Sequence, residues 1–218
     1  MIKVKIKIIY FCYLIPDDWS VLNEQITDLK KSGLYDIATE LYINCVIQKE
    51  KENKFRDIIT KNASKFIIKN ISYENTYEYV GIKCLYDTAE PNSFSFYFHT
   101  KGISNKSIEN DMYRRFLFNK LSKYKNIIPI FMKDKYMEKV SCFPSNEGWC
   151  WYNFFWASGE FLLSKDPPVE IPNRKDHRWY YEMWSMGKPS KSYSIITKNK
   201  LFTSHEANFY MHKLFEKK

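Results

Sequence analysis

The chain lacks the short motifs that mark many nucleotide and hydrolase sites. Its 218 residues contain only six glycines, and they form neither a P-loop nor a GxGxxG segment. GxSxG, DxD and the protein-kinase motifs are absent as well. These absences exclude most nucleotide hydrolases and dinucleotide oxidoreductases.

Long apolar runs are also lacking. None reaches the roughly 18 residues that a membrane-spanning helix needs. The first residues, MIKVKIKIIYFCYLI, resemble a signal peptide. However, lysine alternates there with isoleucine and valine at the period of a strand, and no small-residue cleavage site comes before Pro16. We therefore expect a soluble protein without a transmembrane segment.

The cysteines contain no CxxC pair, which argues against a zinc or redox motif. Two of them lie in apolar runs that are typical of strands. We expect all five to be reduced and small core residues, and the protein to be cytoplasmic. They are Cys12, Cys45, Cys84, Cys142 and Cys150.

Arginine is scarce among the basic residues. The formal net charge of +9 favours anionic partners, but only five of the 34 basic residues are arginines and the lysines are spread along the chain. Proteins that read bases directly usually use arginine side chains. We therefore expect phosphate-bearing small molecules, and no nucleic acid, as partners.

The chain is rich in apolar and aromatic residues, at 44% and 18% of its length. That composition is typical of a globular protein, and 218 residues suffice for one domain with a substantial core. Apolar strands are expected over residues 5–14, 39–47, 65–71 and 94–98. Helices are expected between them, over residues 19–31, 52–61 and 77–86.

This alternation predicts an α/β fold with a mostly parallel central sheet flanked by helices. Such sheets bind ligands beyond the carboxyl ends of their strands. The second half is less regular: we expect a helix over 108–124, a strand over 139–143 and a closing helix over 205–216. In the first of these helices, the inward side chains are predicted to be Met112, Phe116, Leu117 and Leu121.

Three clusters carry candidate chemistry, and the first follows the fourth expected strand. His99, Thr100, Lys101 and Gly102 offer a proton carrier or metal ligand, a hydroxyl, a cation for phosphate and a glycine that admits an anion to the backbone. The alternative is a polar turn that simply closes the strand.

The second cluster is the aromatic segment 149–156, in which Asn153 is the only strongly polar side chain. Aromatic faces such as that of Trp156 can stack on the C–H face of a sugar or on a nucleobase, while an amide binds hydroxyls. The alternative is an aromatic core segment, since large aromatics are usually buried.

The third cluster is RWYYEMW, in which Arg178 and Glu182 are four residues apart on an expected helix. They form either an ordinary ion pair or an anion clamp beside a general base. Asp17 and Asp18 are weaker candidates because helix capping explains them. Glu78 flanks a helix start, where a solvated side chain is expected.

Taken together, these clusters make the chain resemble the short glycosyltransferases of GT-A-like fold found in bacterial polysaccharide clusters and large DNA viruses. The resemblance lies in HTKG after a strand, the NFxWA-like segment and R-x-x-x-E-x-W. A Ser-Gly-Leu-Tyr-Asp step at residues 32–36 also fits. The resemblance implies a single domain, with a nucleotide-sugar-binding half over about 1–105 and an acceptor half over about 106–218. It also implies sugar transfer in glycan synthesis from a UDP- or GDP-linked donor to a glycan or glycoprotein, in the host cytoplasm if the protein is viral.

The resemblance also implies roles for residues. His99, Thr100, Lys101, Gly102 and Arg178 would bind the donor, with the sugar under Trp156 and its hydroxyls on Asn153. Glu182 would be the base of an inverting reaction.

The chain departs from the family where GT-A enzymes usually place DxD, since His99-Thr100-Lys101 stands there without a carboxylate. Either Lys101 offsets the diphosphate charge, or His99 joins aspartates elsewhere around Mn²⁺ or Mg²⁺. The tyrosine at 152 replaces a family glycine, and the pattern after HTKG is altered to residues 111–115. Two rival hypotheses are a catalytically inactive relative that binds glycans or nucleotide sugars, and a single-stranded nucleic-acid-binding protein.

Overall fold

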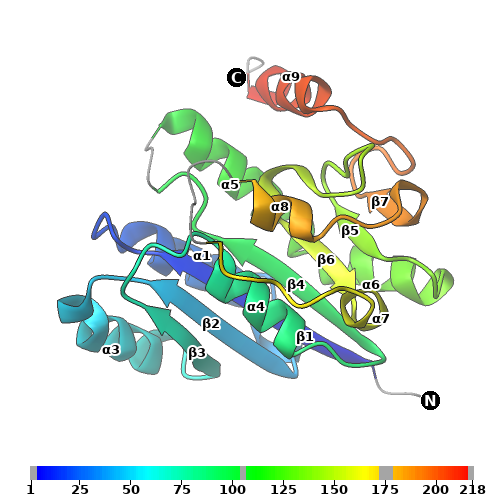
Figure 1. Cartoon of the computed structure of the whole chain (residues 1–218). Helices are drawn as coiled ribbons and strands as arrows, with labels where there is room; N and C mark the ends of the chain where they lie inside the picture. The colour runs from blue at the N-terminus through cyan, green and yellow to red at the C-terminus, as the bar shows by residue number, and fades with distance from the viewer. Residues whose placement is uncertain (1–3, 104–106, 172–178, 216–218) are drawn as a thin grey trace.

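The computed structural model describes residues 4–103, 107–171 and 179–215, which form one α/β domain built on a seven-stranded sheet (Figure 1). The strands are β1 (Lys5–Tyr13), β2 (Glu40–Val46), β3 (Phe66–Ser72), β4 (Ser93–His99), β5 (Lys139–Ser141), β6 (Phe155–Ser158) and β7 (Ser192–Ser194). The α-helices are α1 (Ser20–Lys31), α2 (Leu34–Ile37), α3 (Glu52–Asn62), α4 (Tyr79–Asp87), α5 (Ile108–Leu121), α6 (Tyr124–Lys133), α7 (Gly159–Leu163), α8 (Tyr180–Trp184) and α9 (Ser204–Phe215).

The strand order is β3-β2-β1-β4-β6-β5-β7. The first four strands pair in parallel, whereas β6 runs antiparallel to both β4 and β5. The predicted mostly parallel sheet is therefore confirmed. Because β1 and β4 lie side by side at its centre, their carboxyl ends open on the same edge.

Successive side chains of β1 point to opposite faces of the sheet, and both faces are covered by helices. Ile8, Tyr10 and Cys12 pack into one buried cluster with α1, α3, α5 and α6, while Ile9 and Phe11 pack into a second cluster with α4, α7 and α8. A strand that buries both faces reads as a nearly continuous apolar run, as β1 does.

The first half of the chain follows the predicted elements closely, and the buried stripe of α1 is the expected one: Val21, Leu22, Gln25, Ile26 and Leu29. The second half differs. The single helix expected over 108–124 ends at Leu121, and α6 follows it as a separate helix. The buried face of α5 contains Tyr113, Arg114 and Phe118, whereas Met112 and Phe116 are only half-buried.

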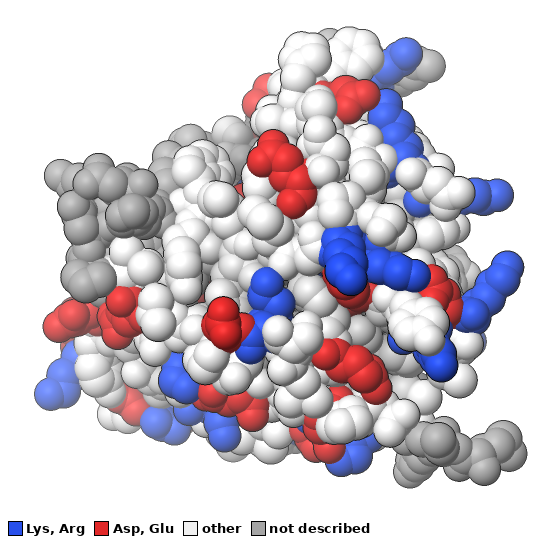
Figure 2. Space-filling view, turned by 45° about the vertical axis from the view of Figure 1, so that its right-hand side comes forward, with Lys and Arg blue, Asp and Glu red and all other residues white. Residues whose placement is uncertain are grey.

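The five cysteines are free and buried, as predicted. In the described part of the chain, no helix is both long and apolar enough to cross a membrane. On the face shown in Figure 2, basic and acidic side chains are interspersed rather than separated into one basic area.

Candidate active site

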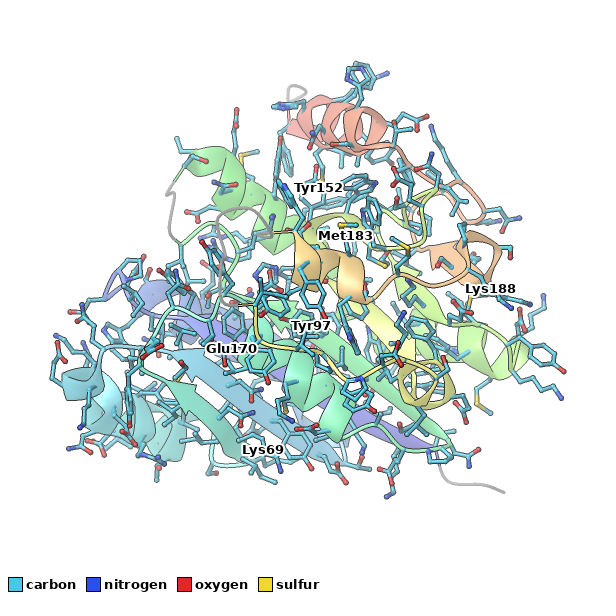
Figure 3. The ribbon with its side chains drawn as sticks, in the orientation of Figure 1. Lys69, Tyr97, Tyr152, Glu170, Met183 and Lys188 are labelled. Atoms are coloured by element: carbon cyan, nitrogen blue, oxygen red, sulfur yellow. The ribbon has the colours of Figure 1, made fainter. Side chains whose placement is uncertain are left out.

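A cavity of about 510 Å³ opens where β1 and β4 end. Its walls come from these two strands, from the segment before α4 and from α8. In Figure 3, the labels of Tyr97 on β4 and Met183 on α8 mark this region of the molecule. The size is that of a pocket for a small ligand. Among the lining residues are Tyr13, Tyr77, Glu78, His99, Lys101, Trp179, Tyr181 and Glu182.

The loop that follows β4 is held in place by hydrogen bonds to β1 and α1. Thr100 donates its N–H to Phe11 O at 3.1 Å, and Thr100 Oγ1 accepts the N–H of Tyr13 at 2.8 Å. Gln25 Nε2 of α1 donates to His99 O at 3.1 Å. The hydroxyl of Thr100 thus links the ends of β1 and β4. Thr100 also lines the cavity.

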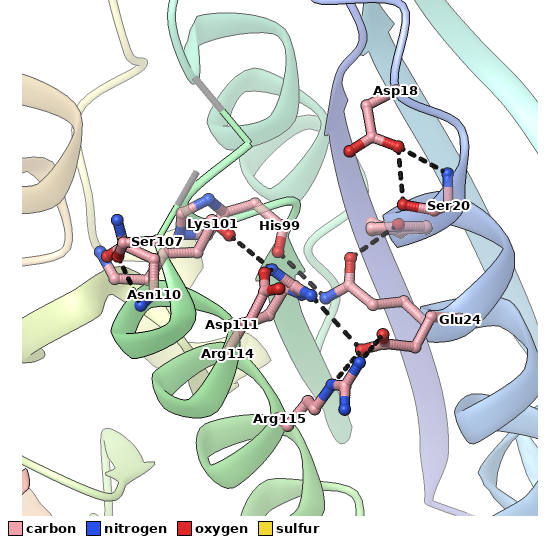
Figure 4. Close-up of polar contacts among 12 residues, drawn as sticks. Asp18, Ser20, Glu24, His99, Lys101, Ser107, Asn110, Asp111, Arg114 and Arg115 are labelled. Carbon is pink, nitrogen blue, oxygen red and sulfur yellow. Dashed lines mark hydrogen bonds and ion pairs between the residues drawn. The ribbon is translucent and has the colours of Figure 1, made fainter. Parts of the chain in front are cut away.

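Arg114 supports the same loop from α5 (Figure 4). Its guanidinium is buried and donates to Lys101 O at 3.2 Å and to Asp111 Oδ1 at 2.7 Å. It also contacts Glu24 Oε1 at 3.4 Å, and Arg115 donates to the same carboxylate. A buried cation with several acceptors fixes the position of the Lys101 backbone.

Gly102 is required where it stands. Its φ of +83° lies in the left-handed region, and a Cβ added there would lie 2.6 Å from Asn110 Cβ. Glycine therefore allows β4 to turn sharply toward α5, which leaves Lys101 at the cavity.

His99 is a neutral side chain in this setting. Burial, and secondarily the charge of Lys101, lowers the pKa of His99 to about 3. His99 Nε2 lies 3.2 Å from Tyr152 O, a carbonyl that can only accept, so Nε2 carries the proton and Nδ1 does not. Glu78 Oε1 lies 3.9 Å from the same nitrogen.

Glu78 is the site residue that sequence reasoning missed. It was expected to be solvated, but its side chain is 17% exposed and lines the cavity. Tyr97 Oη donates to Glu78 Oε2 at 2.8 Å, and Asn153 Nδ2 donates to the same oxygen. Burial raises the pKa of Glu78, against the opposing effects of these two hydrogen bonds and of the Lys101 charge. Among the described residues, none donates a hydrogen bond to Oε1, which lies 3.9 Å from His99 Nε2.

Among the described residues that line the cavity, Lys101 carries the positive charge. Its ammonium lies 5.1 Å from the centre of the Tyr152 ring, a distance typical of a cation–π contact. Tyr152 in turn donates its hydroxyl to Asn208 Oδ1 of α9 at 2.6 Å. Tyr152 therefore orients the lysine.

Glu182 also lines the cavity. It lies on α8, is half-buried, and lines both this cavity and a second one of about 300 Å³. The structure thus brings Glu182 to the same cavity as His99, Thr100, Lys101 and Gly102, although 83 residues separate it from His99.

Two predicted positions are corrected. Trp156 is fully buried in β6, stacks on Phe96 with ring centres 5.2 Å apart, and donates Nε1–H to Leu121 O at 2.8 Å. It lies in the core because β6 is an inner strand covered on both faces, so it cannot stack on a sugar. Asn153 is also fully buried, and its amide nitrogen binds Glu78 rather than a sugar hydroxyl.

Asp17 and Asp18 are not among the residues that line the cavity. Arg178 lies outside the described residues. Asp17 pairs with Lys51 at 3.0 Å, and Asp18 Oδ1 accepts the N–H of Ser20 at 2.9 Å. The N-cap residue of α1 is Trp19, so neither aspartate occupies the predicted cap position.

A metal site was left open by the sequence. Across residues 4–103, 107–171 and 179–215, no three His, Cys, Asp or Glu side chains are grouped so that they could hold a metal ion. Glu78 and His99 form only a pair, and His99 is flanked by the Lys101 cation. The described residues of the cavity therefore do not by themselves make up a metal site.

No protein-family model and no curated protein matches the chain. Among solved structures, a cytidylyltransferase from Leptospira borgpetersenii serovar Hardjo-bovis (strain JB197) is similar, with a TM-score of 0.52 and 12% identity over 99% of this chain and 95% of that one. A 4-diphosphocytidyl-2C-methyl-D-erythritol synthase from Anaerococcus prevotii DSM 20548 aligns over 97% of this chain and 98% of that one, with a TM-score of 0.42 and 12% identity. The leptospiral structure shows that the two proteins share a fold, and at this identity it shows nothing finer.

Proposed function

We propose that the chain is a glycosyltransferase that moves a sugar from a nucleotide-sugar donor to an acceptor hydroxyl. The observation that carries the proposal is a cavity at the carboxyl edge of the sheet that both Lys101 and Glu182 line. Parallel sheets of this kind bind nucleotides at that edge. A cation and a carboxylate are the two groups that transfer from a diphosphate to a hydroxyl needs.

In the proposed reaction, the acceptor hydroxyl attacks the anomeric carbon of the donor sugar. The bond from that carbon to the diphosphate oxygen breaks as the new glycosidic bond forms, and the acceptor proton passes to the Glu182 carboxylate. The nucleoside diphosphate leaves with its charge offset by Lys101. Glu78 Oε1 accepts an N–H or O–H of the nucleoside, and the aromatic walls pack against its base.

Two variants test the assignment, with titration calorimetry for donor binding and product release for turnover. Lys101→Ala should weaken binding of UDP- or GDP-linked sugar about 10- to 100-fold, the loss expected for a charged hydrogen-bonding partner. Glu182→Gln should keep donor binding and cut turnover about 10²- to 10⁴-fold. The matched controls are Lys133→Ala and Glu50→Gln, both exposed and outside the cavity.

The assay should include Mn²⁺, Mg²⁺ and EDTA arms, CTP, and a short single-stranded oligonucleotide. Unchanged turnover in Glu182→Gln would remove its role as base. Productive reaction with CTP would favour nucleotidyl transfer, the activity for which the leptospiral protein of the same fold is named. Donor binding without hydrolysis or transfer would favour an inactive relative. On the face shown in Figure 2, basic and acidic side chains are interspersed and do not form the continuous basic patch typical of a nucleic-acid surface.

A further inference from the structure

A second cavity adjoins the candidate active site. It measures about 300 Å³ and is lined by Trp149, Trp151, Trp179, Glu182, Met183 and Ser204, which we call the tryptophan pocket. Two of these residues, Trp179 and Glu182, also line the first cavity. The two cavities therefore share one wall, and the carboxylate assigned as the base stands in it.

Contacts within the protein fix two of the rings that line the tryptophan pocket. Trp151 donates Nε1–H to Phe202 O at 2.8 Å, and its ring lies edge-on to Trp149 with centres 5.3 Å apart. These contacts fix two large rings at right angles before any ligand binds. A preformed pocket of this kind loses little entropy on binding.

Lys139 joins the two sides of the tryptophan pocket. Its ammonium is buried and donates both to Gly148 O, next to Trp149, and to Ser185 O, just after α8, at 2.5 Å for the latter. Gly187 also donates its N–H to Gly148 O at 2.9 Å. The segment that carries the tryptophans and the helix that carries Glu182 are thus bound to each other.

We propose that the tryptophan pocket is the acceptor site and that it binds a sugar ring. This inference rests on the proposed transferase function. Flat indole faces attract the polarised C–H bonds of one face of a pyranose, while Glu182 and Ser204 supply the few polar groups that such a pocket uses to orient hydroxyls. A hydroxyl of that sugar then reaches Glu182 from the side opposite the donor.

The test uses the full chain and methyl glycosides of glucose, galactose, mannose, N-acetylglucosamine and fucose, with saturation-transfer NMR as the readout. Two variants change residues that line only the tryptophan pocket: Trp151→Ala, and Met183→Glu at a side chain that is 43% exposed and tolerates substitution. Tyr136→Ala, at an exposed ring elsewhere, is the control.

At least one glycoside should bind the unchanged protein, and its affinity should fall about tenfold or more in both variants but not in the control. UDP and GDP should still bind both variants. The proposal is overturned if no glycoside binds, if both variants bind like the unchanged chain, or if hexanoate binds in place of every glycoside. Glycoside binding to a chain that binds no nucleotide would support the tryptophan pocket while refuting the transferase.

Discussion

Replacing Trp156 by phenylalanine should destabilise the protein without directly changing sugar-donor binding. The indole is fully buried, stacks on Phe96 and donates to Leu121 O. Leaving that carbonyl without its partner costs about 1–3 kcal/mol. The void left by the smaller ring adds about 1 kcal/mol. The free energy of unfolding should therefore fall by about 2–4 kcal/mol.

For a chain of this length each kcal/mol lowers Tm by about 2–4 °C, so we expect a fall of about 4–16 °C by circular dichroism. Nucleotide-sugar binding, titrated well below Tm, should be unchanged. The matched control is Trp179→Phe at a 51% exposed indole, which should shift Tm by less than about 2 °C. A Trp156→Phe protein with unchanged Tm and lost donor binding would refute the assignment to the core.

Three further outcomes follow from the loop after β4. In Gly102→Ala, the alanine would have to adopt a φ of +83° with its Cβ against Asn110, so the unfolding free energy measured in urea should fall by about 1–2 kcal/mol or more. Donor binding should also weaken because Lys101 is displaced. Normal donor affinity would contradict this. The pKa of His99 is depressed to about 3, so its contribution to stability is present above its ordinary pKa near 6.5 and is lost as pH falls toward 3. Between pH 7 and 4.5, the His99→Gln variant should therefore lose less unfolding free energy than the unchanged chain. Equal losses in urea unfolding would count against a neutral buried imidazole. Arg114→Met removes the donor to Lys101 O and should raise the KM for the sugar donor more than Arg115→Met does, since Arg115 is exposed and contacts only Glu24 among the described residues.

The first half of the fold could be predicted because its signals are local. Lysine and isoleucine alternate in β1, and the apolar stripe of α1 repeats at helical spacing. Once four parallel strands were expected, the carboxyl end of β4 placed His99 and Lys101 at a binding edge without any knowledge of distant contacts.

Glu78 could not be predicted in the same way. One residue before a helix, a glutamate is usually solvated, and nothing nearby in the sequence indicates otherwise. Its burial depends on Tyr97 and Asn153, which are 19 and 75 residues away. Those partners come together only when β4 and the turn before β6 are placed next to α4.

The prediction that Trp156 stacks on a sugar was wrong for a different reason. Phe155 and Trp156 are both fully buried because β6 is covered on both faces, so period-two alternation carries no signal there. The backbone has positive φ at Tyr152 and Asn153, 68° and 52°, and this turn separates two environments. Trp151 before the turn faces a pocket, whereas Trp156 after it lies in the sheet. Composition alone could not distinguish the two tryptophans.

The shared wall between the two cavities makes the proposals separable by kinetics. Lys101 lines only the first cavity and Trp151 only the second, while Glu182 lines both. If the first cavity holds the sugar donor and the second the acceptor, Lys101→Ala should act mainly on the donor KM and Trp151→Ala mainly on the acceptor KM. Glu182→Gln should act on kcat, since proton transfer is required only in the transition state. A single cavity that served both substrates would instead give variants that raise both KM values together.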